Sequence, residues 1–160
     1  MKREYCLRLN TKGSIMKRNS LILIVALMIA TAFAFSTSLA SAKDMTAKDF
    51  KKEALRNITT ISVSEAKALF DKGGVIFLDV REPKEFKAGH IPDAMNLPRG
   101  LLEFKVGTLI PDKNALVVVY CRTGSRSALA TYTLVRMGYK NVKNMDGGWK
   151  AWADAGYPVE

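Results

Sequence analysis

The sequence predicts an α/β fold with a mainly parallel central sheet of about five strands flanked by helices. Short apolar runs rich in β-branched residues alternate along the chain with segments that have helical spacing and helix-end signals. Two of these runs, 75–78 and 116–120, are apolar without interruption, which is typical of strands buried on both faces of a sheet. The apolar fraction of 48% and the charged fraction of 25% exclude a disordered chain.

The predicted elements follow one another from residue 43 onward. Residues 43–57 are polar and rich in lysine, and they predict a short helix or a tether. Thr60 to Val63 predicts a strand, and Ser64 is expected to cap a helix over 65–71 that ends at Gly73. Further strands are expected at 75–80, 94–97, 116–120 and 141–145, and further helices at 83–87, 101–110, 127–137 and 149–155. The run 116–120 is the most hydrophobic, so we expect it at the centre of the sheet.

Residues 1–42 predict an export signal. A basic stretch at 16–20 precedes an apolar run at 21–35, and a small, polar segment then ends in Ala40-Ser41-Ala42. This order is typical of a secretory signal peptide cleaved after Ala42, because the run is shorter than the about 20 apolar residues that cross a bilayer. We therefore expect export, with the bacterial periplasm as the compartment. The alternative is an uncleaved N-terminal anchor that holds the protein outside the membrane.

The net charge of +10 divides equally between the signal and the rest of the chain. Residues 1–42 hold six basic residues and one acidic, and residues 43–160 hold nineteen and fourteen, so each part carries +5. The expected domain at 58–160, with its polar extension at 43–57, is therefore only mildly basic. It lacks the clustered basic and stacking aromatic residues that nucleic-acid binding needs. Membrane contact is expected only if the signal stays uncleaved.

The cysteine and histidine content excludes two further kinds of structure. Two cysteines and one histidine in the whole sequence exclude a disulfide scaffold and an ordinary zinc site. The start of translation stays open between Met1 and Met16, and a start at Met16 would remove Cys6. Cleavage after residue 42 would also remove it, so Cys121 would be the single cysteine of the mature protein.

Cys121 occupies a position that favours reactivity over a structural role. It directly follows the predicted central strand, and sites in parallel α/β sheets form at the carboxyl ends of strands. The N-terminus of the next helix favours an anion there, and the loop with Gly124 can turn amides inward. Arg122 and Arg126 add positive charge. These features predict a lowered pKa for the Cys121 thiol.

The length of the loop separates two kinds of cysteine chemistry. Cysteine phosphatases have five residues between the cysteine and the arginine. Here four residues separate Cys121 from Arg126, namely Arg122, Thr123, Gly124 and Ser125. The smaller ring suits a single sulfur atom carried on Cys121 better than a phosphoryl group. Position 127, where a phosphatase would have its arginine, is a serine.

Several motifs occur in order over about 100 residues of the chain. They are Leu78-Asp79-Val80-Arg81-Glu82-Pro83, Gly89-His90-Ile91-Pro92-Asp93-Ala94, Tyr120-Cys121-Arg122-Thr123-Gly124-Ser125-Arg126-Ser127 and Asn144-Met145-Asp146-Gly147-Gly148-Trp149. With these motifs the chain resembles the single-domain rhodaneses, which are thiosulfate sulfurtransferase-like proteins. The resemblance implies a rhodanese-like α/β fold. Asp93 stands at a turn where the family usually has glycine.

The resemblance implies a double displacement through Cys121. The thiolate would take the outer sulfur of a small anionic donor such as thiosulfate or a polysulfide, and would pass it from a persulfide to cyanide or to a thiol, including a protein thiol. Arg122 and Arg126 would bind the charge of the donor and of the departing sulfite. Backbone N–H groups would come from Thr123, Gly124 and Ser125. No metal and no organic cofactor is implied.

Other polar residues favour structural roles. We interpret His90 as part of a turn, because a thiolate mechanism needs no general base. Asp79 and Arg81 end a predicted strand, and Arg81 is expected to pair with Glu82 or Glu85 and so fix the loops. Lys51 and Lys52 are interpreted as part of a solvated face.

Two other functions stay open beside sulfur transfer. The first is a sulfur carrier or sulfide-binding module that presents a Cys121 persulfide without catalysing its transfer. The second is a small cysteine phosphatase or arsenate reductase.

Overall fold

The protein is described by a computed structural model that covers residues 44–160. Its centre is a five-stranded sheet in the order β1-β5-β4-β2-β3, in which every pair of neighbouring strands is parallel. The strands are β1 (Thr59–Ile61), β2 (Ile76–Asp79), β3 (Met95–Asn96), β4 (Leu116–Tyr120) and β5 (Asn141–Met145). The predicted α/β fold is confirmed, and the most hydrophobic run, β4, is the central strand.

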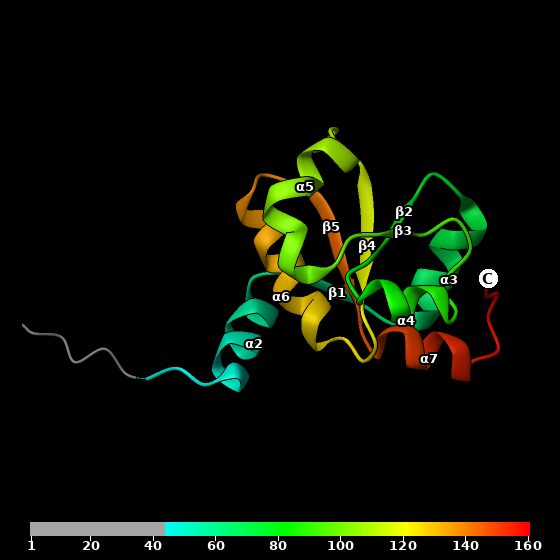
Figure 1. Ribbon diagram of the computed structural model, residues 1–160, viewed down its shortest axis with the longest axis horizontal. Coiled ribbons are helices and arrows are strands. Elements are labelled where there is room, and N and C mark those ends of the chain that lie inside the picture. Colours follow the sequence, from blue (N-terminus) through cyan, green and yellow to red (C-terminus); the bar gives the residue numbers. More distant parts are fainter. Residues whose placement is uncertain (1–43) are drawn as a thin grey trace, which may run out of the picture. The chain divides into compact units, whose positions relative to one another are not determined.

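Helices cover both faces of this sheet. They are α2 (Ala47–Arg56), α3 (Val63–Lys72), α4 (Pro83–Lys87), η1 (Arg99–Leu101), α5 (Leu102–Leu109), α6 (Ser125–Arg136) and α7 (Gly148–Asp154). Figure 1 shows α5 and α6 to one side of the strands and α3 and α7 to the other. Helix α2 packs along α6. The protein is therefore a three-layer α/β structure whose outer helix α2 comes from the polar segment 43–57.

The central strand separates two hydrophobic clusters. Val117 and Val119 of β4 pack with residues of α5 and α6, whereas Val118 and Tyr120 pack with Trp152 of α7 and with α3. All of these side chains are fully buried. Successive side chains of a strand point to opposite faces, so burial of every residue requires helices on both sides.

Two predicted helix starts differ from the structure by two residues. Helix α3 is capped by Ser62 rather than by Ser64, because Ser62 and Glu65 form a reciprocal capping box. Helix α6 begins at Ser125, two residues before the predicted start, because Gly124 takes a left-handed conformation and acts as its N-cap. The polar segment 43–57 forms a helix rather than a tether, with its own capping box between Thr46 and Asp49.

The predicted export signal lies outside the described residues, as do the cleavage point after Ala42 and Cys6. Within residues 44–160, every helix is too short or too polar to cross a membrane.

Candidate active site

Cys121 is the first residue after the central strand β4, at the carboxyl end of the sheet. Its Sγ atom accepts a hydrogen bond of 3.2 Å from the backbone N–H of Gly124. Gly124 reaches this position with a φ of 94°, a conformation that glycine adopts readily and that turns the loop back over the sulfur. The Cys121 side chain is buried. The loop therefore closes over a single sulfur atom.

Hydrogen bonds control the acidity of this thiol. Burial raises the pKa of Cys121, but hydrogen bonds from Ser127, Thr123 and Gly124 lower it by more, so that the pKa lies below its ordinary value. The contributions from Thr123 and Gly124 come from their backbone N–H groups. The lowered pKa that the sequence predicts for the Cys121 thiol is also the direction found in the structure. The causes that lower it most are the hydrogen-bond donors around the sulfur, and the charge of Arg126 also interacts with the thiolate.

Ser127 is a site residue that the sequence reasoning missed. It lies in the first turn of α6, fully buried, and both its hydroxyl and its backbone N–H contribute to the lowered pKa of Cys121. The hydroxyl also donates to Asn144 Oδ1 at 2.7 Å. The hydroxyl has one hydrogen and cannot donate it to Asn144 and to the sulfur at the same time. The backbone N–H groups are therefore the donors that the sulfur keeps while the hydroxyl is bonded to Asn144. A hydroxyl in the first turn of the helix that follows the cysteine is the signal that could have identified it.

The N-terminus of α7 holds the start of the loop. The backbone N–H of Trp149 donates to the Cys121 carbonyl at 2.7 Å, and that of Lys150 donates to the Arg122 carbonyl at 3.0 Å. Gly148 makes this contact possible, because a Cβ atom there would overlap the Cys121 carbonyl oxygen. The loop is thus fixed from α6 on one side and from α7 on the other.

The two loop arginines have different surroundings. Arg126 forms a two-point ion pair with Glu85 of α4, at 2.7 and 2.8 Å, and its charge is matched before any substrate binds. Its pKa is raised mainly by the hydrogen bond to Glu85, and the negative charge of Cys121 adds a smaller contribution. The side chain of Arg122 is exposed. Donor binding by Arg122 and Arg126 stays a prediction, and in the structure the charge of Arg126 is already paired with Glu85.

Asp79 and Arg81 form a buried ion pair at the end of β2. Arg81 Nε lies 3.0 and 2.8 Å from the two carboxylate oxygens of Asp79, and its Nη2 donates to the Gly89 carbonyl at 2.8 Å. The expected pairing of Arg81 with Glu82 or Glu85 is wrong, because Arg81 folds back to Asp79 while Glu85 binds Arg126. The guanidinium also lies over the Trp149 ring, 4.9 Å from its centroid.

His90 contacts the C-terminal segment and α4. Its ring stacks on Phe86 with a centroid distance of 3.7 Å, and its Nδ1 lies 3.1 Å from the Phe86 carbonyl. Its backbone N–H and carbonyl both pair with Glu160. Each of these contacts is made outside the loop of Cys121.

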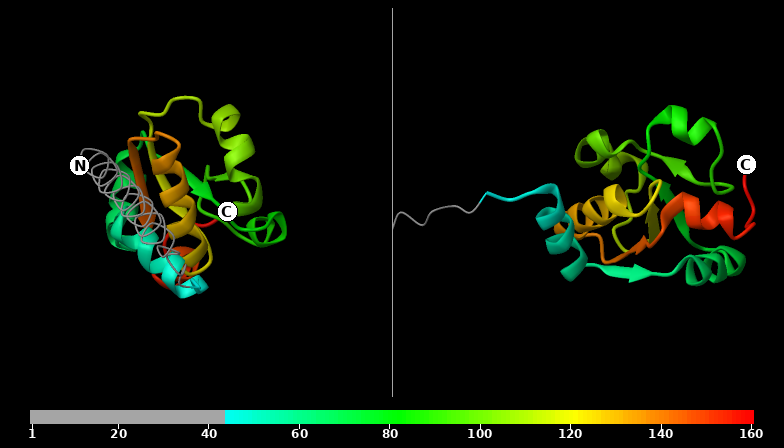
Figure 2. Two further views of the ribbon diagram at one scale, coloured as in Figure 1. Left: turned by 90° about the vertical axis from the view of Figure 1, so that its left-hand side faces the viewer. Right: turned by 90° about the horizontal axis from the view of Figure 1, so that it is seen from below.

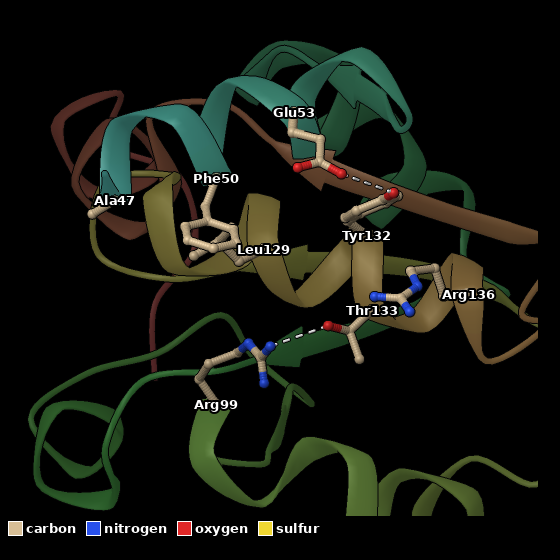
Figure 3. A pocket seen from close by; sticks show the side chains of 8 residues that line it. All are labelled: Ala47, Phe50, Glu53, Arg99, Leu129, Tyr132, Thr133 and Arg136. Carbon is tan, nitrogen blue, oxygen red and sulfur yellow. Dashed lines mark hydrogen bonds between the residues drawn. The ribbon is translucent and has the colours of Figure 1, made fainter. Parts of the chain in front are cut away.

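A separate pocket of about 380 Å³ lies between α2, η1 and α6 (Figure 3). Its lining consists of Ala47, Phe50, Glu53, Arg99, Leu129, Tyr132, Thr133 and Arg136. None of the loop residues 121–126 lines it. The thiol and its hydrogen-bond donors converge at the loop, outside this pocket.

The profile of the rhodanese-like domain family matches residues 62–155, from the cap of α3 to the end of α7. This chain belongs to the rhodanese-like domain family. Helix α2 precedes the matched residues.

Relatives of this rhodanese-like domain include named sulfurtransferases. It is 40% identical over 98 residues to a sulfurtransferase of Allochromatium vinosum, covering 61% of this chain and 90% of that protein. It is 37% identical over 115 residues to thiosulfate sulfurtransferase 18 of Arabidopsis thaliana, covering 64% and 83%. The family assignment is therefore supported by sequence over most of the length of both relatives.

Solved structures share the fold. A protein of Rhodopseudomonas palustris described as a possible tyrosine phosphatase superposes with a TM-score of 0.69 and 33% identity, over 77% of this chain and all of that one. A thiosulfate sulfurtransferase of Pseudomonas aeruginosa gives a TM-score of 0.63 and 29% identity, over 71% of this chain and 22% of the other.

Proposed function

We propose that this rhodanese-like protein is a sulfurtransferase that carries a sulfane sulfur on Cys121. The donor is thiosulfate or a related polysulfide or persulfide, and the acceptor is cyanide or a thiol. The observation that carries the proposal is the loop itself, in which backbone N–H groups surround one sulfur atom at the end of β4. The named sulfurtransferases among the relatives support the same class of reaction.

The first half-reaction is a displacement at sulfur. The Cys121 thiolate attacks the outer sulfur of thiosulfate, a new S–S bond forms, and the bond to the sulfonate sulfur breaks with its electron pair leaving on sulfite. In the second half-reaction the acceptor attacks the outer sulfur of the persulfide, and the electron pair of that S–S bond returns to Cys121. A lowered thiol pKa increases the fraction of Cys121 that is present as the thiolate nucleophile at a given pH. The cycle requires neither a metal nor an organic cofactor.

Loop residues have distinct roles in this proposal. The N–H groups of Thr123 and Gly124 stabilise negative charge on sulfur in the thiolate and in the persulfide. The exposed Arg122 attracts the anionic donor. Arg126 holds the loop to α4 through Glu85.

Replacing Cys121 tests the proposal. Cys121→Ser should lower the rate of thiosulfate:cyanide sulfur transfer by at least about 1,000-fold, because no other group can replace the nucleophile. In the unprocessed chain of residues 1–160, Cys6→Ser removes the other cysteine and serves as the matched control, which should leave the rate unchanged. Mass spectrometry of the thiosulfate-treated protein should show one added sulfur atom on Cys121.

Two results would contradict the proposal. A Cys121 persulfide that forms but is not turned over by cyanide or thiols would make the protein a sulfur carrier. Hydrolysis of p-nitrophenyl phosphate that depends on Cys121, without sulfur transfer, would make it a phosphatase, as the description of the Rhodopseudomonas palustris protein suggests for that protein.

A further inference from the structure

Lys51 connects helix α2 to the loop of the candidate site. Its Nζ atom donates a hydrogen bond of 3.1 Å to the hydroxyl of Ser125, the first residue of α6. Ser125 lies 74 positions further along the chain and follows Gly124 directly. Lys51 is partly buried, unlike its exposed neighbour Lys52. Lys51 lies on a solvated face, as interpreted from the sequence, but unlike Lys52 it makes a specific contact with another element.

Packing of α2 on α6 fixes the position of this lysine. Ala54 is fully buried, and Phe50 lies beside Leu129 of α6 in the lining of the pocket (Figure 3). The capping box of Thr46 and Asp49 defines the first turn of the helix. Figure 2 shows α2 alongside α6, near the point where the loop enters that helix. Lys51 is thus held at the loop by a packed helix rather than by a free chain end.

The charge of Lys51 is not matched by a carboxylate. Among residues 44–160, its ammonium makes no salt bridge, and its recorded hydrogen bond is to a neutral hydroxyl. Arg126, in contrast, is already paired with Glu85. A positive charge at the N-terminal end of a helix adds to the attraction that the helix dipole exerts on anions.

We propose that Lys51 is a positioning residue of the Cys121 site, which fixes Ser125 and gives the loop a preference for anionic substrates. The proposal rests on the proposed function and assigns part of its donor specificity to a helix outside the matched family domain. Thiosulfate carries two negative charges, so the effect should appear in its binding rather than in the transfer of its sulfur atom.

Variants of matched charge test this role. Lys51→Met should raise the KM for thiosulfate by about three- to ten-fold at low salt, with little change in kcat. Lys52→Met removes the same charge from an exposed neighbour and should leave both parameters unchanged. Lys51→Arg should restore most of the loss. The difference between the two methionine variants should shrink in 1 M salt, where charges are screened over about 3 Å.

Alkylation of Cys121 gives a second measurement that does not depend on sulfur transfer. Lys51→Met should lower the alkylation rate with anionic iodoacetate about three- to ten-fold relative to neutral iodoacetamide, whereas Lys52→Met should keep the wild-type ratio. A Lys51→Met protein with the wild-type ratio would overturn the proposal. Equal slowing with both reagents would also overturn it, because that result indicates only a structural role.

The alkylation ratio distinguishes failure of the proposed sulfur transfer from failure of the proposed role of Lys51. If the wild-type protein forms no persulfide with thiosulfate, yet the ratio falls in Lys51→Met, then the proposed function fails and the role of Lys51 in anion selection stands. Thermal unfolding midpoints of both methionine variants should match that of the wild type, which verifies that the comparison is made between folded proteins.

Discussion

Glu85 and Arg126 show at the residue scale how a partner changes the role of a side chain. Hydrogen bonds from Arg126, opposed by partial burial, lower the pKa of Glu85 from 4.5 to about 2. A carboxylate whose pKa is lower in the folded state stabilises that state at pH values above its unfolded pKa. This contribution is complete above about pH 4.5 and is lost as the pH falls towards 2. The pair thus attaches the loop to α4 at neutral pH.

A double-mutant cycle should measure this ion pair. With Glu85→Gln, Arg126→Met and the double variant, we expect a coupling of about 1 kcal/mol at pH 7 in urea unfolding. This figure is small because the two side chains are 31% and 38% exposed and are screened by water. The coupling should fall to a small fraction near pH 2. A coupling that is the same at both pH values would show that charge does not hold the pair together.

At the scale of elements, the contact between α7 and the loop places Cys121. Gly148 has a φ of 58°, and a Cβ atom there would lie 2.9 Å from the Arg122 carbonyl carbon. The glycine therefore lets the first turn of α7 approach the backbone of the loop closely enough for its N–H groups to bond. A side chain at this position would push α7 and the loop apart.

Two alanine variants should separate this overlap from backbone strain. Gly156 has a similar φ of 67° but no atom within 4 Å of its Cβ position, so Gly156→Ala reports strain alone. We expect it to lower the free energy of unfolding by about 1 kcal/mol. Gly148→Ala should lower it by at least about 2 kcal/mol more, because overlap adds to strain. If urea unfolding shows the same loss of unfolding free energy in both variants, the overlap expected at position 148 does not destabilise the protein.

At the scale of the whole molecule, parallel packing brings distant segments to one end of the sheet. Cys121 at the end of β4 contacts α7 from the C-terminal part of the chain. Helix α6, which follows the loop, packs against α2 from the segment before the family domain (Figure 1). The part of the chain from 43 to 160 carries a net charge of +5, which favours anions.

We propose that the working protein is an exported chain that begins at Lys43. Expression in a bacterial host with an intact secretion pathway should give a periplasmic protein whose intact mass corresponds to residues 43–160. A fraction should be heavier by about 32 Da, the mass of one sulfur atom, if Cys121 is recovered as a persulfide. A full-length mass in the membrane fraction would instead support the uncleaved anchor.

The sequence alone predicted the elements whose signals are local. The bounds of β4, β5 and α4 agree with the structure because apolar runs and a proline at a helix start act on neighbouring residues. The parallel sheet and the position of Cys121 at the end of its central strand followed from the order of the elements. The cap of α3 was misplaced by two residues, since Ser62 and Ser64 both suit a helix start and the reciprocal bond with Glu65 selects Ser62.

Tertiary structure alone decided the partners of the charged and hydroxyl side chains. Arg126 and Glu85 are 41 positions apart, and Lys51 and Ser125 are 74 apart, so no local pattern could pair them. Sequence periodicity shows which face of an element is apolar, but not which element packs against it. The sequence therefore determined the fold and the place of Cys121 in it, whereas packing of distant helices decided how the charged side chains near that cysteine are paired.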